Sequence, residues 1–150
     1  MKKLLFVFIL CSIAMACFAQ VENPVKWNFS AKKINATTYE VHLTAKVEDG
    51  WHIYSQTTPE GGPIPTSILF TRNPFLSFDG AVKEKGKMEQ HFEELFGVEV
   101  KQFSDKVDFI QVVKLKSSAK TNISGAVEFM TCNDHECMPP KTEKFSITLK

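Results

Sequence analysis

The sequence comprises 150 residues, 43% of them hydrophobic, and carries a formal net charge of +1 at pH 7. This length suits one domain whose core is large enough to fold without disulfide staples. The charged residues are spread along the chain, which argues against a nucleic-acid-binding protein. Residues 83–87 form the densest charged stretch, and we interpret them as a solvated loop.

The chain begins with the features of an export signal. Two lysines precede the apolar run 4–16, and small residues stand at the positions that a signal peptidase reads before Gln20. We predict a signal peptide over 1–19 and a periplasmic or secreted domain over 20–150. A minor alternative makes Cys17 the lipid-bearing residue of a lipoprotein. No later apolar run reaches the roughly 20 residues of a transmembrane helix, so we expect no membrane span in the mature chain.

Alternation of apolar and polar residues predicts an all-β chain. The eight predicted strands cover 25–34, 39–47, 51–54, 67–71, 98–103, 107–115, 125–131 and 144–149. Residues 88–96 are interpreted as one or two helical turns or an ordered loop, and residues 79–80 as a turn. Short strands separated by turn signals are typical of an immunoglobulin-like antiparallel β-sandwich, which we predict as the fold.

A pair of cysteines, Cys132 and Cys137, provides the only thiols outside the predicted signal peptide. In an oxidising compartment, cysteines this close become either a disulfide or part of a metal site. They lie on a hairpin-like loop whose four intervening residues are all polar and suit a turn. Closing so short a ring contributes only about 2 kcal/mol in the chain-entropy model, which is little for a structural staple. Exposed disulfides of this kind are open to attack by a partner's thiolate.

Three interpretations of the cysteine pair stay open on the residues alone. The pair exchanges electrons with partners, or it pins the hairpin of a non-catalytic interaction module, or it binds a metal together with His135. The metal interpretation lacks a second Cys/His pair, so we expect no metal and no other cofactor. Protonated His135 would favour a thiolate, whereas Asp134 and Glu136 would oppose one. Such acidic neighbours suit a pair that receives its electrons from a more reactive partner.

Several separated segments support one of these interpretations. They are residues 24–27 (PVKW), 50–56 (GWHIYSQ), 61–66 (GGPIPT), 95–97 (LFG), 107–109 (VDF), 125–129 (GAVEF) and 132–140 (CNDHECMPP). Together they resemble the N-terminal, periplasmic domain of DsbD, the bacterial transmembrane thiol:disulfide interchange protein. The resemblance implies an immunoglobulin-like thiol:disulfide oxidoreductase domain that depends on partners. It would take electrons from a thioredoxin-like or membrane reductase donor and reduce oxidised periplasmic thiol proteins.

The resemblance also implies a cap over the cysteines. In the family, a loop carrying an aromatic residue covers the pair until a partner docks. Leu95, Phe96 and Gly97 match this loop, so Phe96 is the expected lid, with Glu93 and Glu94 as acidic modulators beside it. The alternative is that Phe96 belongs to the core. Asp134 and His135 are the modulators expected next to the cysteines themselves, whereas Trp51 and Tyr54 are interpreted as packing residues and His52 as a packed, hydrogen-bonded histidine.

Position in the family motif makes Cys137 the cysteine expected to bond to the client and Cys132 the one that resolves the mixed disulfide. Two departures from the family qualify the comparison. The better-known members carry one more residue between their cysteines. DsbD also continues into a membrane-spanning conduit and a C-terminal thioredoxin-like domain, whereas this sequence ends at Lys150. We therefore expect that a separate protein must reduce this domain. We also expect the domain to be a monomer.

Overall fold

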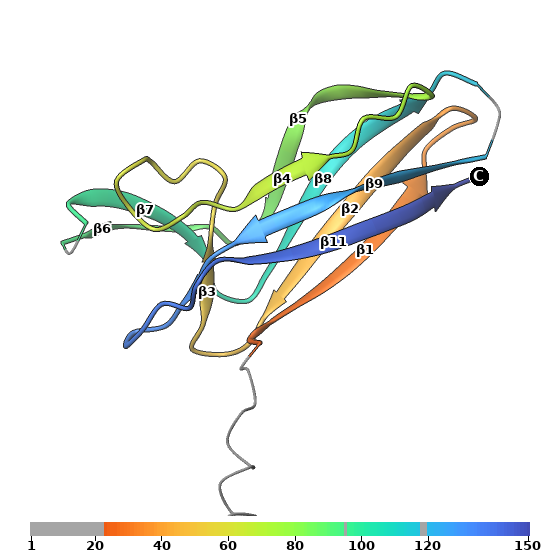
Figure 1. The fold of residues 1–150 in the computed structure, drawn as a ribbon. Helices are drawn as coiled ribbons and strands as arrows, with labels where there is room; N and C mark the ends of the chain where they lie inside the picture. The colour runs from red at the N-terminus through yellow and green to blue at the C-terminus, as the bar shows by residue number, and fades with distance from the viewer. Residues whose placement is uncertain (1–22, 95, 118–119) are drawn as a thin grey trace, which may run out of the picture.

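The computed structural model describes residues 23–94, 96–117 and 120–150. These residues form antiparallel β-strands and no helix, so the structure contains no helix long and apolar enough to cross a membrane within this part of the chain (Figure 1). The predicted signal peptide, its cleavage site before Gln20 and the alternative lipid attachment at Cys17 lie outside the described residues.

Eleven strands make up the described part of the chain. They are β1 Val25–Lys33, β2 Thr38–Val47, β3 His52–Tyr54, β4 Ser67–Phe70, β5 Leu76–Gly86, β6 Glu89–Glu93, β7 Val98–Phe103, β8 Lys106–Leu115, β9 Thr121–Phe129, β10 Thr131–Cys132 and β11 Lys141–Leu149. One sheet has the order β1-β2-β8-β5, and a second has the order β11-β9-β4. A third, β10-β3-β7-β6, lies at one end of the molecule, where β6 and β7 project beyond the other strands (Figure 1).

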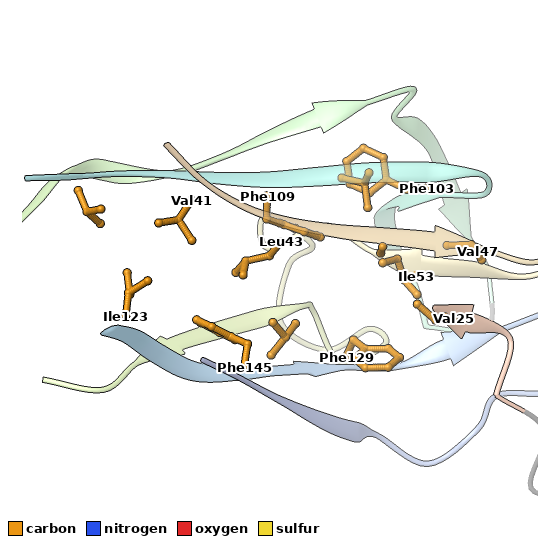
Figure 2. Packing of buried hydrophobic residues seen from close by; sticks show 14 of the residues in the cluster. Val25, Val41, Leu43, Val47, Ile53, Phe103, Phe109, Ile123, Phe129 and Phe145 are labelled. Atoms are coloured by element: carbon orange, nitrogen blue, oxygen red, sulfur yellow. The ribbon is translucent and has the colours of Figure 1, made fainter. Parts of the chain in front are cut away.

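The core lies between the first two sheets because each strand turns one apolar face inward. In β2 the predicted odd positions, Tyr39, Val41, Leu43, Ala45 and Val47, are all buried. Figure 2 shows Val41, Leu43 and Phe109 from one sheet facing Ile123, Phe129 and Phe145 from the other. This arrangement confirms the predicted all-β sandwich, whose two faces bury apolar residues that alternate with polar ones.

Aromatic residues fill much of the space between the two layers. The ring of Trp27 on β1 lies 5.3 Å from that of Phe129 on β9, and Phe29 lies 5.3 Å from Phe145 on β11. Ile53 and Phe103 extend the same core from the third sheet. This shared packing fixes the third sheet, which carries Cys132, against the sandwich.

Three sequence interpretations are wrong because bulges and edge strands mask the alternation. The predicted turn at Asp79 and Gly80 is an irregularity within β5, where the pairing with β8 shifts between Asp79 and Lys83. Gly80 has φ of 70°, and the side-chain amide of Gln111 donates to the carbonyl oxygens of Asp79 and Gly80. Residues 83–87, interpreted as a loop, lie largely within β5.

The third interpretation concerns residues 88–96, for which the sequence suggested helical turns or a loop. Residues 89–93 form β6, which pairs with β7, and Glu94 and Phe96 lie in the turn between these strands. β6 is an edge strand with only partial burial, so its side chains do not show the alternation of a half-buried strand. This hairpin carries two of the predicted cap residues, Phe96 and Gly97, at the end of the third sheet.

Gly125 is the one glycine of β9, and two neighbours approach it closely. A Cβ atom at this position would overlap the carbonyl oxygen of Leu69 on β4 and lie 2.7 Å from Cζ of Phe145. We expect Gly125→Ala to lower the free energy of unfolding by about 1–3 kcal/mol, the usual range for an overpacked core. Urea unfolding measures this effect. Ser146→Ala, an exposed change on β11, is the control and should stay within about 0.5 kcal/mol of the wild type.

Candidate functional site

A hairpin at the end of β9 holds the two cysteines opposite each other. Cys132 and Cys137 form an isolated antiparallel bridge, with their Cα atoms 4.0 Å apart. Backbone hydrogen bonds lie on either side of them: Met138 N donates to Thr131 O at 2.8 Å, and Asn133 N donates to Glu136 O at 2.9 Å. Opposed residues between such bonds have closely spaced side chains, about 4.5 Å between Cα atoms. The geometry allows the Cys132–Cys137 disulfide that the structure contains.

The turn between the cysteines is fixed by the side chain of Asn133. Its Oδ1 accepts hydrogen bonds from the backbone N–H groups of His135 and Glu136, each at 2.8 Å. Asparagine commonly stabilises turns in this way, by mimicking a backbone carbonyl. Because these bonds do not involve sulfur, they are available to hold the hairpin whether the pair is oxidised or reduced.

The two cysteines differ in their access to solvent. Cys132 is 2% exposed and packs in a small cluster with Tyr54 and Val100. Cys137 is exposed. Cys137 is therefore the more accessible of the two residues.

A pocket of about 600 Å³ lies beside the disulfide. Both cysteines and the intervening residues 133–136 line it, together with His52, Tyr54, His91, Glu93, Phe96 and Gln102. The pairing of β10, β3 and β7 determines which residues form the floor of this pocket. Cys132 pairs with His52, and Tyr54 pairs with Gln102, so alternate residues of β10, β3 and β7 present one face to the pocket.

The structure brings most of the predicted site residues together at this pocket. Phe96 lines it and is 39% exposed, so the alternative that Phe96 belongs to the core is wrong. Glu93, Asp134 and His135 also line it. Glu94 and Gly97 belong to the hairpin tip, where Gly97 has φ of 70° and its N–H donates to Glu93 O. Leu95 lies outside the described residues.

Sequence reasoning missed four residues of the pocket: His52, Tyr54, His91 and Gln102. Tyr54 is buried, as its interpretation as a packing residue implies, but it also lines the pocket. The alternation of β3 places His52 and Tyr54 on one face. Only the pairing of β3 with β10 places that face beside Cys132, and no local pattern in the sequence specifies this pairing.

Burial controls the protonation of the two aromatic groups on the pocket floor. The ring Nε2 of His52 lies 3.0 Å from the hydroxyl of Tyr54. Burial, and secondarily the nearby charge of His91, lowers the pKa of His52, although Asp134, Glu89 and Glu93 act in the opposite direction. Burial, with a smaller effect of Glu93, raises the pKa of Tyr54 to about 12. At neutral pH the pair is therefore an uncharged, hydrogen-bonded unit.

The lowered pKa of His52 predicts a loss of stability in acid. The folded state disfavours its protonation, so below about pH 6.5 the unfolded chain binds more protons than the folded one. As the pH falls from about 6.5 to the lowered pKa of His52, the free energy of unfolding should decrease. Below that pKa, His52 is protonated in both states and makes no further contribution to the decrease. His52→Gln should remove this component. Urea unfolding at pH 7.5 and 5.5 measures it, and an equal pH dependence in both proteins would contradict the assignment.

Within the described residues, no group of three or more His, Cys, Asp or Glu side chains is arranged to hold a metal ion. Cys132 and Cys137 are bonded to each other, whereas a metal ligand must be a thiolate. The pocket thus contains a disulfide bond between one buried and one exposed cysteine.

Three solved structures share the fold. The N-terminal periplasmic domain of ScsB from Proteus mirabilis has a TM-score of 0.58 and 18% identity over 85% of this chain; this chain spans about half of it, 47%. The N-terminal domain of Neisseria meningitidis DsbD in the reduced form has a TM-score of 0.55 and 14% identity over 87% of this chain and 90% of that one. A complex of the DsbD and PilB N-terminal domains from the same organism matches with a TM-score of 0.53 and 11% identity, covering 87% of each chain.

Sequence comparison with curated proteins finds no significant match. By contrast, the sequence profile of the family described as "Thiol:disulfide interchange protein DsbD, N-terminal" matches residues 19–149, which is nearly the whole chain. The match includes all the strands, the hairpin of β6 and β7, and both cysteines. The chain belongs to the family of DsbD N-terminal domains, which take part in thiol–disulfide exchange.

Proposed function

We propose that this domain is a periplasmic electron carrier, exported by a signal peptide over 1–19. It takes electrons from a reduced thioredoxin-like protein or a membrane reductase and passes them to oxidised thiol proteins. The observation that carries the proposal is the Cys132–Cys137 disulfide, which has one exposed and one buried residue and lines a pocket of about 600 Å³. The solved complex of the DsbD and PilB N-terminal domains supports a role that depends on protein partners.

The difference in exposure supports an order of events for reduction. A donor thiolate attacks Sγ of Cys137, a mixed disulfide forms, and Cys132 leaves as a thiolate that takes up a proton. The second thiol of the donor then loses its proton and attacks the donor's own sulfur, which releases Cys137. The donor ends with a disulfide, and the carrier has gained two electrons and two protons.

Delivery to the client reverses these roles. The Cys137 thiolate attacks the client's disulfide, and one client sulfur leaves as a thiolate. Cys132 then loses its proton, attacks Sγ of Cys137 and restores the carrier's disulfide, which frees the reduced client. The carboxylates of Asp134 and Glu136 disfavour a thiolate beside them, whereas protonated His135 favours one.

Phe96 is the proposed lid over the disulfide, and Leu95 and Gly97 complete the proposed cap loop. Phe96 lines the pocket from the hairpin of β6 and β7 and is not held in the core. We expect Phe96→Ala to speed reduction of the disulfide by a small thiol such as dithiothreitol by about tenfold, which corresponds to about 1.4 kcal/mol in the activation barrier. Stopped-flow thiol trapping measures the rate. Phe92→Ala, at an exposed position on the same hairpin that does not line the pocket, is the control and should leave the rate unchanged. A rate that does not rise in Phe96→Ala would remove Phe96 from this role.

The proposal is tested by mixing the oxidised domain with a reduced thioredoxin-like protein and counting the thiols that appear. We expect two new thiols on the domain, at Cys132 and Cys137, and a matching loss from the donor. Absence of exchange with any such donor would make the disulfide a structural staple instead.

A further inference from the structure

Among the described residues, three carboxylates away from the disulfide form ion pairs with lysine, whereas the carboxylates that line the pocket beside the disulfide form none with lysine or arginine. Glu48 lies 3.3 Å from Lys26, and Asp79 lies 2.7 Å from Lys114. At the pocket, three carboxylates belong to Glu93, Asp134 and Glu136, and among the described residues no lysine or arginine lines the pocket with them.

Among the residues that line the pocket in the described part of the chain, histidines are the only basic side chains near these carboxylates. Glu93 lies 3.6 Å from His91, an ion pair only when the histidine is protonated. His52 offers no compensation at neutral pH, because burial lowers its pKa. In the described part of the chain, the side chains of Asp134 and Glu136 form no ion pair, although both lie in the turn between the cysteines. With its histidines neutral, the lining of the pocket, as far as the structure describes it, therefore carries net negative charge.

This charge bears directly on exchange, because the attacking group is itself a thiolate. The carboxylates repel an anionic thiol and attract one with a cationic group nearby, and such fields change the rate of encounter more than the final affinity. Phe96, which is exposed and lines the same pocket as these carboxylates, offers an apolar surface to a partner.

Resting on the proposed function, we infer that this pocket selects redox partners whose surface around the reactive cysteine is basic. Its acidic rim, made by Glu93 of the β6–β7 hairpin and by Asp134 and Glu136 of the cysteine turn, disfavours partners with an acidic surface there. The charge of the partner is thus a specificity determinant, separate from the chemistry of the disulfide.

Small thiols of similar size and different charge test this inference on the intact oxidised domain. Cysteamine is cationic, 2-mercaptoethanol neutral and 3-mercaptopropionate anionic. Each rate constant for reduction of the domain's disulfide is calculated per concentration of thiolate. It is then divided by the rate constant of the same thiolate with bis(2-hydroxyethyl) disulfide, an uncharged reference, which removes differences in intrinsic reactivity. We expect cysteamine to exceed 3-mercaptopropionate by about three- to tenfold at low ionic strength, and the ratio to shrink at 0.5 M salt, as screening of nearby charges requires.

Charge-removing variants assign the effect to the rim. In the double variant Asp134→Asn, Glu136→Gln, the ratio of the cysteamine rate to the 3-mercaptopropionate rate should move toward one. We expect the logarithm of this ratio to fall to half its wild-type value or less. Glu40→Gln is the matched control, because Glu40 lies near the start of β2, away from the end that leads to β3, and it should keep the wild-type ratio. A wild-type ratio near one, or a ratio that the double variant leaves unchanged, would overturn the inference while leaving exchange intact. Failure of all three thiols to reduce the disulfide would instead contradict the proposed function.

Discussion

Cys137→Ser is expected to abolish exchange with clients, and Cys132→Ser is expected to accumulate a mixed disulfide between Cys137 and the client. The reason is the difference in exposure between the two cysteines. Cys137 is exposed, whereas Cys132 is only 2% exposed and packs against Tyr54. Without Cys132, the mixed disulfide has no neighbouring thiol to resolve it. Incubating each reduced variant with an oxidised thioredoxin-like client and weighing the products by mass spectrometry measures the adducts.

The expected result is a near-stoichiometric adduct for Cys132→Ser and none for Cys137→Ser. The opposite pattern, with an adduct only at Cys132, would reverse the proposed order of attack. Loss of the disulfide itself should cost only about 2 kcal/mol of stability because the closed ring is short. Urea unfolding of both variants is therefore the control that each remains folded.

Phe129→Ala is expected to lower the free energy of unfolding by about 3–5 kcal/mol, the usual cost of removing a buried aromatic side chain. Phe129 is 1% exposed, and its ring lies 5.3 Å from that of Trp27 across the sandwich. The change leaves a cavity between the two layers, which rigid neighbouring strands fill only in part. Urea unfolding followed by tryptophan fluorescence measures the loss.

Leu69→Ala is the control for this loss of core packing. Leu69 lies on β4 and is 74% exposed, so its truncation removes little buried surface. It should change the free energy of unfolding by no more than about 0.5 kcal/mol. A similar loss in both variants would show that Phe129 does not hold the two layers together.

The sequence predicts the strands that are half buried in the sandwich because their alternation is a direct consequence of having one face in the core. β2 and β8 show this most clearly. The sequence does not predict β5 and β6, because neither strand shows a regular alternation of buried and exposed residues. β5 contains an irregularity at Asp79 to Lys83, and β6 is a partly exposed edge strand, so neither keeps a buried face in register.

The cysteine pair is recognisable from local sequence, and the resemblance to the family singles out Phe96, whereas neither identifies the residues of the pocket floor. His52 and Tyr54 reach the site through the pairing of β10 with β3, two strands that are far apart in the chain. Gln102 reaches it through the next pairing, of β3 with β7. Long-range register of this kind depends on how the whole sheet assembles, and short strands carry too few residues to specify it.

The reduction potential of the Cys132–Cys137 pair distinguishes an electron carrier from a structural staple most directly. Equilibrating the domain with defined ratios of reduced and oxidised dithiothreitol, followed by thiol trapping and mass spectrometry, gives the midpoint. We expect a value between about −270 and −180 mV, the range of proteins that exchange electrons with thioredoxin-like partners. A value below about −300 mV, typical of structural disulfides that resist reduction, would contradict the proposed function.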